Sequence, residues 1–131
     1  MALQRLNPEG LPRPEAYSQL VVGSGLRTVF IAGQVALNAA GEVVAEGDLA
    51  GQARQVYANI GAALAAAGAS PADVAKLTTY VVGYSPEHLP AIREAREAVF
   101  GSSLPASTLV GVQALARPEF LIEVEAVAVL D

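Results

Sequence analysis

Cysteine is absent from the 131-residue sequence, and histidine occurs once. The missing cysteine excludes disulfides, thiolate nucleophiles, and zinc or iron–sulfur sites that are held by thiolates. Carboxylates alone would have to supply most metal ligands, and no acidic pair stands at a recognisable ligand spacing. No glycine-rich segment matches a phosphate or dinucleotide loop. We therefore expect neither a metal nor a cofactor.

Basic residues and long apolar runs are also scarce. Eight Lys and Arg stand against thirteen Asp and Glu, so the net charge is −5, whereas a nucleic-acid partner requires a basic surface. Hydrophobic residues make up 53% of the chain, yet no run reaches the roughly 20 residues of a membrane span. The first residues also lack the apolar stretch of a signal peptide. We expect one cytoplasmic domain over residues 1–131, with no membrane or nucleic-acid partner.

Two helical patterns are interleaved with short β-favouring segments. Prolines in residues 1–13 predict an irregular leader, and Gly23-Ser24-Gly25 predicts a hairpin between the segments on either side. The second helix is expected to be irregular up to Pro90. In chain order we expect strands at 19–22, 28–33 and 42–44, a helix at 48–67, a strand at 76–84, a helix at 86–100, and strands at 108–115 and 120–130.

This order, β-β-α-β-α-β-β, predicts an α+β fold in which both helices cover one face of a mixed sheet. The other face would stay uncovered. In the last strand Val127 and Val129 share a side with Glu123 and Glu125, so the uncovered face is partly apolar. A monomer would expose more apolar surface than soluble monomers usually do, which predicts a closed homo-oligomer.

Few residues offer chemistry by type alone. His88 is expected to be a solvent-exposed helix residue, and no segment has the strand–turn–helix signature of a nucleophilic serine. Glu123 and Glu125 remain, two residues apart on one side of a strand. Neighbouring carboxylates that share partial burial tend to have a raised pKa, which suits a general base toward water. Alternatively, both are solvated or pair with basic residues at a subunit contact.

A series of short motifs runs in order along most of the chain, from about residue 14 to 130. The motifs are Tyr17-Ser18-Gln19, Ala32-Gly33-Gln34, Gly47-Asp48 with Gln52 and Asn59-Ile60, Ala67-Gly68, the strand 76–82, Phe100, Pro105-Ala106, Val110-Gly111-Val112 and Val124-Glu125-Ala126-Val127-Ala128. As a set they resemble the Rid family of reactive intermediate deaminases (YjgF-type, also called L-PSP endoribonuclease-like). The resemblance implies a chorismate-mutase-like fold and a homotrimer whose sheets form an inner barrel. It also implies small-molecule sites between subunits, where enamines or imines are hydrolysed to 2-oxo acids and ammonia.

The resemblance assigns roles to particular positions. The glutamate that positions water falls on Glu123, and substrate contacts fall on Tyr17, Ala32 and Gly33. The arginine that clamps the substrate carboxylate in active deaminases falls on Ser107. Because a serine carries no charge, we expect altered specificity, with Ser107 and Thr108 hydrogen-bonding a less acidic or neutral group.

Another arginine is a candidate for the missing charge. Arg93 stands seven residues before Phe100, where the family often has an asparagine, and Arg96 follows one turn later. One possibility is that Arg93 or Arg96 restores an anion-binding site. The other is that both side chains are solvated and pair with Glu94 or Glu97 along the helix. Arg117, in the turn before the last strand, is a weaker candidate.

The expected function is therefore an enamine or imine hydrolase with altered specificity, whose ligand is an imine, a 2-oxo acid or a related metabolite. The alternative is a trimer that binds a small metabolite without turning it over. A ribonuclease activity is disfavoured, because the chain is acidic and lacks clusters of basic and aromatic residues.

Overall fold

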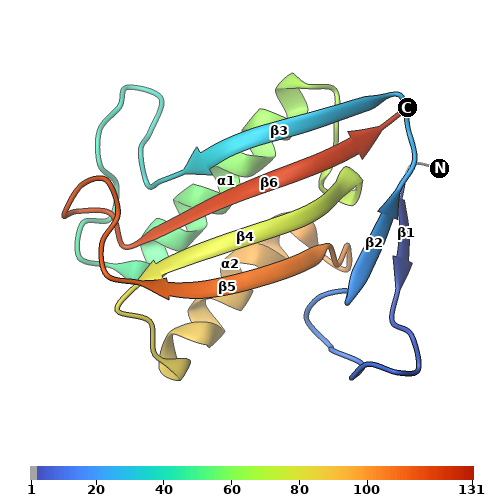
Figure 1. The fold of residues 1–131 in the computed structure, drawn as a ribbon. Coiled ribbons are helices and arrows are strands. Elements are labelled where there is room, and N and C mark those ends of the chain that lie inside the picture. Colours follow the sequence, from blue (N-terminus) through green and yellow to red (C-terminus); the bar gives the residue numbers. More distant parts are fainter. Residues whose placement is uncertain (1–2) are drawn as a thin grey trace.

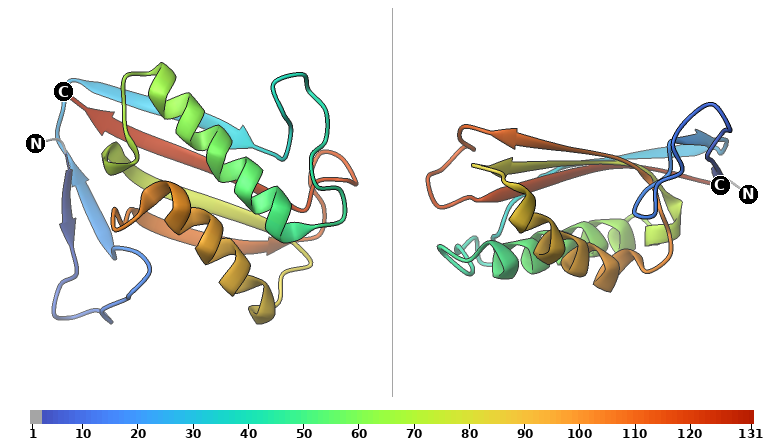
Figure 2. Two further views of the ribbon diagram at one scale, coloured as in Figure 1. Left: turned by 180° about the vertical axis from the view of Figure 1, so that it is seen from behind. Right: turned by 90° about the horizontal axis from the view of Figure 1, so that it is seen from below.

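The computed structural model describes residues 3–131, in which two helices pack against one face of a β-sheet (Figure 1). Both helices lie on the same side when the sheet is seen edge-on (Figure 2), as the order of elements predicts. The elements are β1 (Leu3–Leu6), β2 (Leu20–Gly23), β3 (Arg27–Gln34), α1 (Leu49–Ala66), the 3-10 turn η1 (Pro71–Asp73), β4 (Val74–Val82), the 3-10 turn η2 (Pro86–His88), α2 (Leu89–Phe100), β5 (Ala106–Val112) and β6 (Ile122–Leu130).

The main sheet is mixed, with the strand order β3-β6-β4-β5. β6 runs antiparallel to both of its neighbours, and β4 and β5 run parallel. Along β6 the even-numbered residues, from Ile122 to Leu130, are buried beneath the helices, and the odd-numbered ones point to the other side. The alternation in the sequence therefore identifies the two faces of β6 correctly.

The N-terminal region differs from the prediction. β2 pairs with β1, and β3 pairs with β6, so the hairpin expected around Gly23-Ser24-Gly25 is wrong. The reason is that the glycines carry the chain past the end of β6: a Cβ on Gly25 would lie 2.7 Å from the carbonyl oxygen of Leu130. Residues 42–44 contribute only an isolated bridge between Val43 and Leu37.

The leader predicted to be irregular contains β1, and its residues 1 and 2 lie outside the described part of the chain. No helix within residues 3–131 has both the length and the apolar character needed to cross a membrane. Nor do His, Asp and Glu gather there in groups of three or more that would suit a metal ion.

The helix boundaries follow the predicted signals closely. α1 begins directly after Asp48, and Gly68 has the left-handed φ of +72° that favours glycine beyond a helix end. η2 precedes α2, as the position of Pro90 indicates. His88 is half-buried, and its Nδ1 accepts a hydrogen bond of 3.1 Å from the backbone N–H of Ser85. It therefore stabilises this turn, instead of standing free on a solvated helix face.

One polar residue of α1 is completely buried and joins the helix to the chain before β6. The Nε2 of Gln52 donates to the Glu119 carbonyl at 2.8 Å, and its Oε1 accepts from the Leu121 N–H at 2.9 Å. Gln52 thereby fixes the backbone two residues before Glu123.

We expect Gln52→Ala to lower the free energy of unfolding by about 2–3 kcal/mol, because it leaves buried backbone groups without partners. Arg54→Ala, at an exposed position of the same helix, is the matched control and should change stability by less than about 0.5 kcal/mol. Urea denaturation measures both. Equal effects of the two substitutions would contradict this role of Gln52.

Candidate ligand-binding site

A cavity of about 350 Å³ lies on the helix side of the sheet. The segment before β2 supplies Tyr17, α2 supplies Arg93 and Arg96, and β5 supplies Ser107. Leu89, Ile92 and Leu109 add apolar walls. A hollow that combines apolar walls with convergent polar groups can accommodate a small molecule.

Tyr17 reaches this cavity because the next residue ties its segment to the chain at the start of β5. The Ser18 N–H donates to the Pro105 carbonyl at 3.1 Å, and the Ser18 hydroxyl donates to the Leu104 carbonyl. Ser18 is buried. Ser107 then follows in β5 and faces the helices, so Tyr17 and Ser107 line the same cavity.

The cavity is positively charged in an acidic protein. Arg93 and Arg96 line it, and none of the described lining residues carries a carboxylate. Within residues 3–131 the one ion pair joins Arg117 to Glu119 at 3.0 Å, so the pairing of Arg93 and Arg96 with acidic neighbours along α2 does not form. Two guanidinium groups at a cavity without an acidic side chain suit an anionic ligand.

Two buried hydroxyl groups also line the cavity. The side-chain oxygens of Tyr57, from α1, and Thr79, from β4, are 3.2 Å apart and hydrogen-bonded. Burial raises the pKa of Tyr57, and the hydrogen bond to Thr79 and the positive charge of Arg96 oppose this rise. The Tyr57 phenol is therefore neutral at physiological pH. Arg96 lies close enough for its positive charge to act on the Tyr57 hydroxyl.

Glu123 lies on the other face of the sheet. β3 has an irregularity between Ile31 and Gln34, opposite the β6 segment 124–126, and such bulges redirect nearby side chains. At this point a Cβ on Gly33 would overlap the Glu123 carboxylate. Gly33 is thus required for the position of Glu123, and Ala32 is its exposed neighbour.

The other predicted residues are held elsewhere. Glu125 accepts a hydrogen bond of 3.0 Å from the Tyr80 hydroxyl, which raises the pKa of Tyr80. The Thr108 hydroxyl accepts a bond of 2.8 Å from the Lys76 ammonium and points away from the cavity, because alternate residues of β5 face opposite sides. Arg117 is paired with Glu119 and stacks over Phe120.

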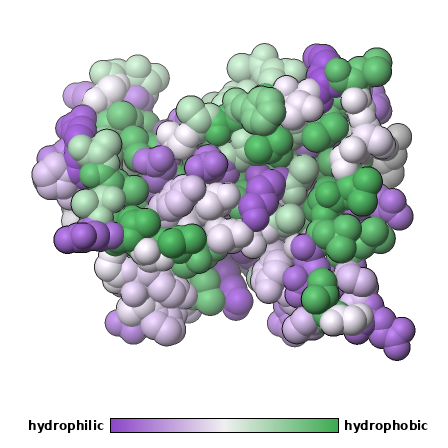
Figure 3. Space-filling model, viewed as in Figure 1, coloured by the Kyte–Doolittle hydropathy of each residue, from purple (hydrophilic) through white to green (hydrophobic). Residues whose placement is uncertain are grey.

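The structure thus brings the predicted site residues into two groups on opposite faces of the sheet. Tyr17, Arg93 and Ser107 share the cavity on the helix side, and Ala32, Gly33 and Glu123 lie together on the open side. On the open side Phe30 is 79% exposed and Val110 is 39% exposed, and hydrophobic residues spread over much of this face in Figure 3. A single copy of the chain cannot bring Glu123 to its own cavity.

Sequence reasoning missed Tyr57 and Thr79. Tyr57 follows Val56 on the apolar side of α1, and Thr79 lies between Leu77 and Val81 on the buried side of β4. Both therefore fit an ordinary core pattern. The sequence did carry one signal: α1 and β4 each have a hydroxyl-bearing residue at a core position. Because buried polar groups require partners, two such residues are candidates to bond to each other.

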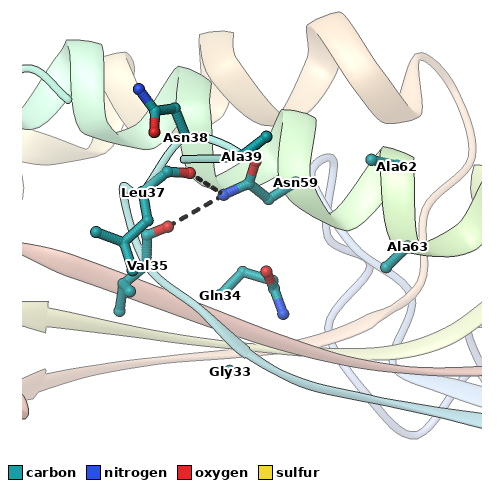
Figure 4. A pocket seen from close by; sticks show the side chains of 9 residues that line it. All are labelled: Gly33, Gln34, Val35, Leu37, Asn38, Ala39, Asn59, Ala62 and Ala63. Atoms are coloured by element: carbon teal, nitrogen blue, oxygen red, sulfur yellow. Dashed lines mark hydrogen bonds between the residues drawn. The ribbon is translucent and has the colours of Figure 1, made fainter. Parts of the chain in front are cut away.

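A second hollow of about 550 Å³ lies between the chain that follows β3 and α1, beside Gly33 (Figure 4). The Asn59 side-chain amide donates to the Val35 and Leu37 carbonyls at 3.1 and 2.9 Å, as the dashed lines in Figure 4 show. Gln34 donates to the Ala32 carbonyl at 3.0 Å. The Asn59 amide thus holds the loop against α1, which gives the Asn59-Ile60 motif a structural role.

The fold and the cavity together define a small α+β protein whose cavity is lined by two arginines. The sequence matches the family described as Endoribonuclease L-PSP over residues 11–130. The chain belongs to this family, which includes the Rid proteins.

Individual relatives agree with this assignment. The crystal structure of YyfB, a Rid family protein of Yersinia pestis, is 47% identical and has a TM-score of 0.93, with 99% of this chain and 100% of that chain covered. A RutC family protein of Pyrococcus horikoshii is 37% identical over 92% of each chain. A protein of Dermatophagoides farinae named 2-iminobutanoate/2-iminopropanoate deaminase is 31% identical over 88% of this chain and 86% of its own length.

Proposed function

We propose that the protein is a Rid-type hydrolase that converts anionic imines or enamines to 2-oxo acids and ammonia, with a specificity that differs from deaminases carrying the β5 arginine. The observation that carries this proposal is the cavity in which Arg93 and Arg96, which have no acidic partner among residues 3–131, stand with Ser107. Relatives named as 2-iminobutanoate/2-iminopropanoate deaminases support the reaction class. In this proposal Arg93, from α2, binds the anionic group, and Ser107 donates a hydrogen bond to it.

The reaction assigns one step to Glu123. Its carboxylate takes a proton from water as the water oxygen bonds to the imine carbon, and it passes this proton to the imine nitrogen, which gives a neutral carbinolamine. Glu123 then takes the carbinolamine hydroxyl proton and passes it to the amino group as the C–N bond breaks, so that a 2-oxo acid and ammonia are released. One imine and one water are consumed, and Glu123 returns to its starting state.

We further infer that the sites lie between the subunits of a homotrimer. Two features support this inference: the predicted residues stand on opposite faces of one sheet, and the open face carries exposed Phe30 and Val110. In the trimer, Glu123 and Gly33 of one copy would face the cavity of a neighbour. The number of subunits comes from the resemblance to the family. Sedimentation in dilute solution should therefore give about three times the 13.4 kDa of one chain, and a monomer would contradict the shared site.

Ammonia release from 2-iminopropionate is the test of the reaction. We expect turnover above the rate of spontaneous hydrolysis. Binding of 2-oxo acids without any ammonia release would overturn the hydrolase and favour a trimer that only binds a metabolite. We also infer a cytoplasmic protein without nucleic-acid ligands, and the net charge of −5 supports the second point despite the family's name.

Gly33→Ala should reduce turnover strongly while the protein stays folded. The added methyl group would occupy the position of the Glu123 carboxylate, so the carboxylate has to move away from the bulge. We expect kcat to fall by roughly tenfold to a hundredfold, since small displacements of a positioned group have effects of this size. Gly61→Ala is the matched control, because its Cβ would lie 3.6 Å from the nearest atom, in Val99. Equal kcat values for the two variants would contradict this role of Gly33.

A further inference from the structure

We infer that the Tyr57–Thr79 hydroxyl pair favours ligands whose side chain ends in a polar group, such as a carboxamide, over ligands with an aliphatic end of the same shape. This inference rests on the proposed function, which places the anionic end of the ligand at Arg93. Among 2-imino and 2-oxo acids, it predicts a preference for those whose side chain is long enough to place a polar group at Tyr57 and Thr79.

The Tyr57–Thr79 pair has one hydrogen-bond donor more than it uses. The two hydroxyls are 3.2 Å apart and share one hydrogen bond, and either oxygen can be its donor. Each hydroxyl has one hydrogen, so one O–H of the pair is left over. Within residues 3–131 no other protein group bonds to either oxygen. Buried polar groups nearly always have a partner, so this O–H is available to a molecule in the cavity.

The pair is more deeply buried than the other polar residues that line the cavity. Tyr57 and Thr79 are 1% and 3% exposed, whereas Ser107 is half-buried and Arg93 is exposed. All four residues line the same cavity. The cavity therefore deepens from a mouth at Arg93, past the Ser107 hydroxyl, to a floor formed by Tyr57 and Thr79. The half-buried Arg96 adds positive charge near the Tyr57 hydroxyl. A ligand held by its anionic group at the mouth extends its side chain toward Tyr57 and Thr79.

The walls of the cavity differ in character from its floor. Leu89, Ile92 and Leu109 provide apolar contacts on the way down, which suit the methylene of a short side chain. Tyr57 is held in place by an edge-to-face contact with Phe100, with ring centroids 6.3 Å apart. A purely aliphatic side chain would reach the floor and leave the free O–H without a partner, whereas a carboxamide both accepts from it and donates to the second oxygen.

The test compares two ligands of the same shape. Freshly prepared 2-oxosuccinamate and 4-methyl-2-oxopentanoate share the carboxylate, the ketone and a branched side chain, which ends in an amide in the first and in two methyl groups in the second. We expect calorimetry on the intact protein to show tighter binding of the amide, by on the order of tenfold or more. The double variant Tyr57→Phe/Thr79→Val should bind the two ligands with about equal affinity.

The double variant removes both hydroxyls at nearly constant shape, so neither is left unpaired and the fold should be retained. Thr78→Val is the matched control: it makes the same change one residue earlier in β4, on the open face, and should keep the preference. Equal binding of the two ligands by the wild-type protein would overturn the inference, and so would a double variant that keeps the preference. In either case the free O–H would have a bound water as its partner, not the ligand.

The binding readout separates this inference from the proposed function. Equal binding of the two ligands with ammonia release from imines would overturn only the selection by Tyr57 and Thr79. An amide preference without ammonia release would uphold the selection and overturn the hydrolase. Failure of both ligands to bind would overturn the anion site at Arg93, and the selection with it.

Discussion

Arg93→Ala is expected to lower kcat/KM for 2-iminopropionate by roughly two to three powers of ten, because a charge-assisted hydrogen bond to a carboxylate in a partly buried site contributes a few kcal/mol. Arg93 lines the cavity together with Ser107 and has no acidic partner within residues 3–131. The effect should appear in the affinity for 2-oxo acids as well as in turnover. The coupled ammonia assay and calorimetry measure the two quantities.

A second substitution sharpens this prediction. Ser107→Arg, made in the Arg93→Ala background, returns a guanidinium to the same cavity from β5 and should recover at least part of the lost kcat/KM. Arg117→Ala is the control for loss of an arginine elsewhere, since Arg117 is bound to Glu119 outside the cavity, and it should leave both quantities unchanged. Unaltered 2-oxo acid binding by Arg93→Ala would show that α2 does not supply the anion site.

Glu123→Gln is the substitution with the other large expected effect. A glutamine keeps the size of the side chain but cannot take a proton, so kcat should fall by roughly a hundredfold to ten-thousandfold. The affinity for 2-oxo acids should change little, because the anion is held by Arg93. Single-turnover kinetics and calorimetry distinguish these two effects.

Glu125→Gln is the matched control for this change. Glu125 lies two residues further along β6 on the same face, and it accepts a hydrogen bond from Tyr80, which a glutamine oxygen can also accept. Its kcat should stay near that of the wild-type protein. If Glu125→Gln reduces kcat as much as Glu123→Gln, the assignment of the base to Glu123 is wrong.

The regular elements were predictable where periodicity and end signals agree. α1 combines a long stripe of apolar residues with Asp48 at its start and Gly68 beyond its end, and its bounds came out within two residues. β6 was predictable because apolar and acidic residues alternate over its first half and the rest is rich in β-branched valine. The pairing of β2 and β3 was not, because Gly23-Ser24-Gly25 permits either a tight turn or a passage alongside another strand. Only the contact of Gly25 with Leu130 decides between them.

The resemblance to the family indicated Tyr17, Ser107 and Glu123 as candidate site residues, and Arg93 as the position at which the family often has an asparagine. It did not indicate how these residues are arranged around the sheet. Ser107 and Thr108 point to opposite faces of the sheet because β5 is a regular strand at both residues. The contribution of Tyr57 and Thr79 depends on the packing of α1 against β4, which no local pattern reveals.

The central claim is that each active site combines the cavity of one copy with the Glu123 of another. It is tested most directly by mixing two inactive variants, Arg93→Ala and Glu123→Gln, after unfolding and refolding them together in equal amounts. If the claim holds, some sites of the mixed oligomers contain Arg93 from one copy and Glu123 from the other. Random assembly should then restore roughly one quarter of the wild-type ammonia release. If each site is built within a single copy, the mixture will be no more active than the two variants measured separately.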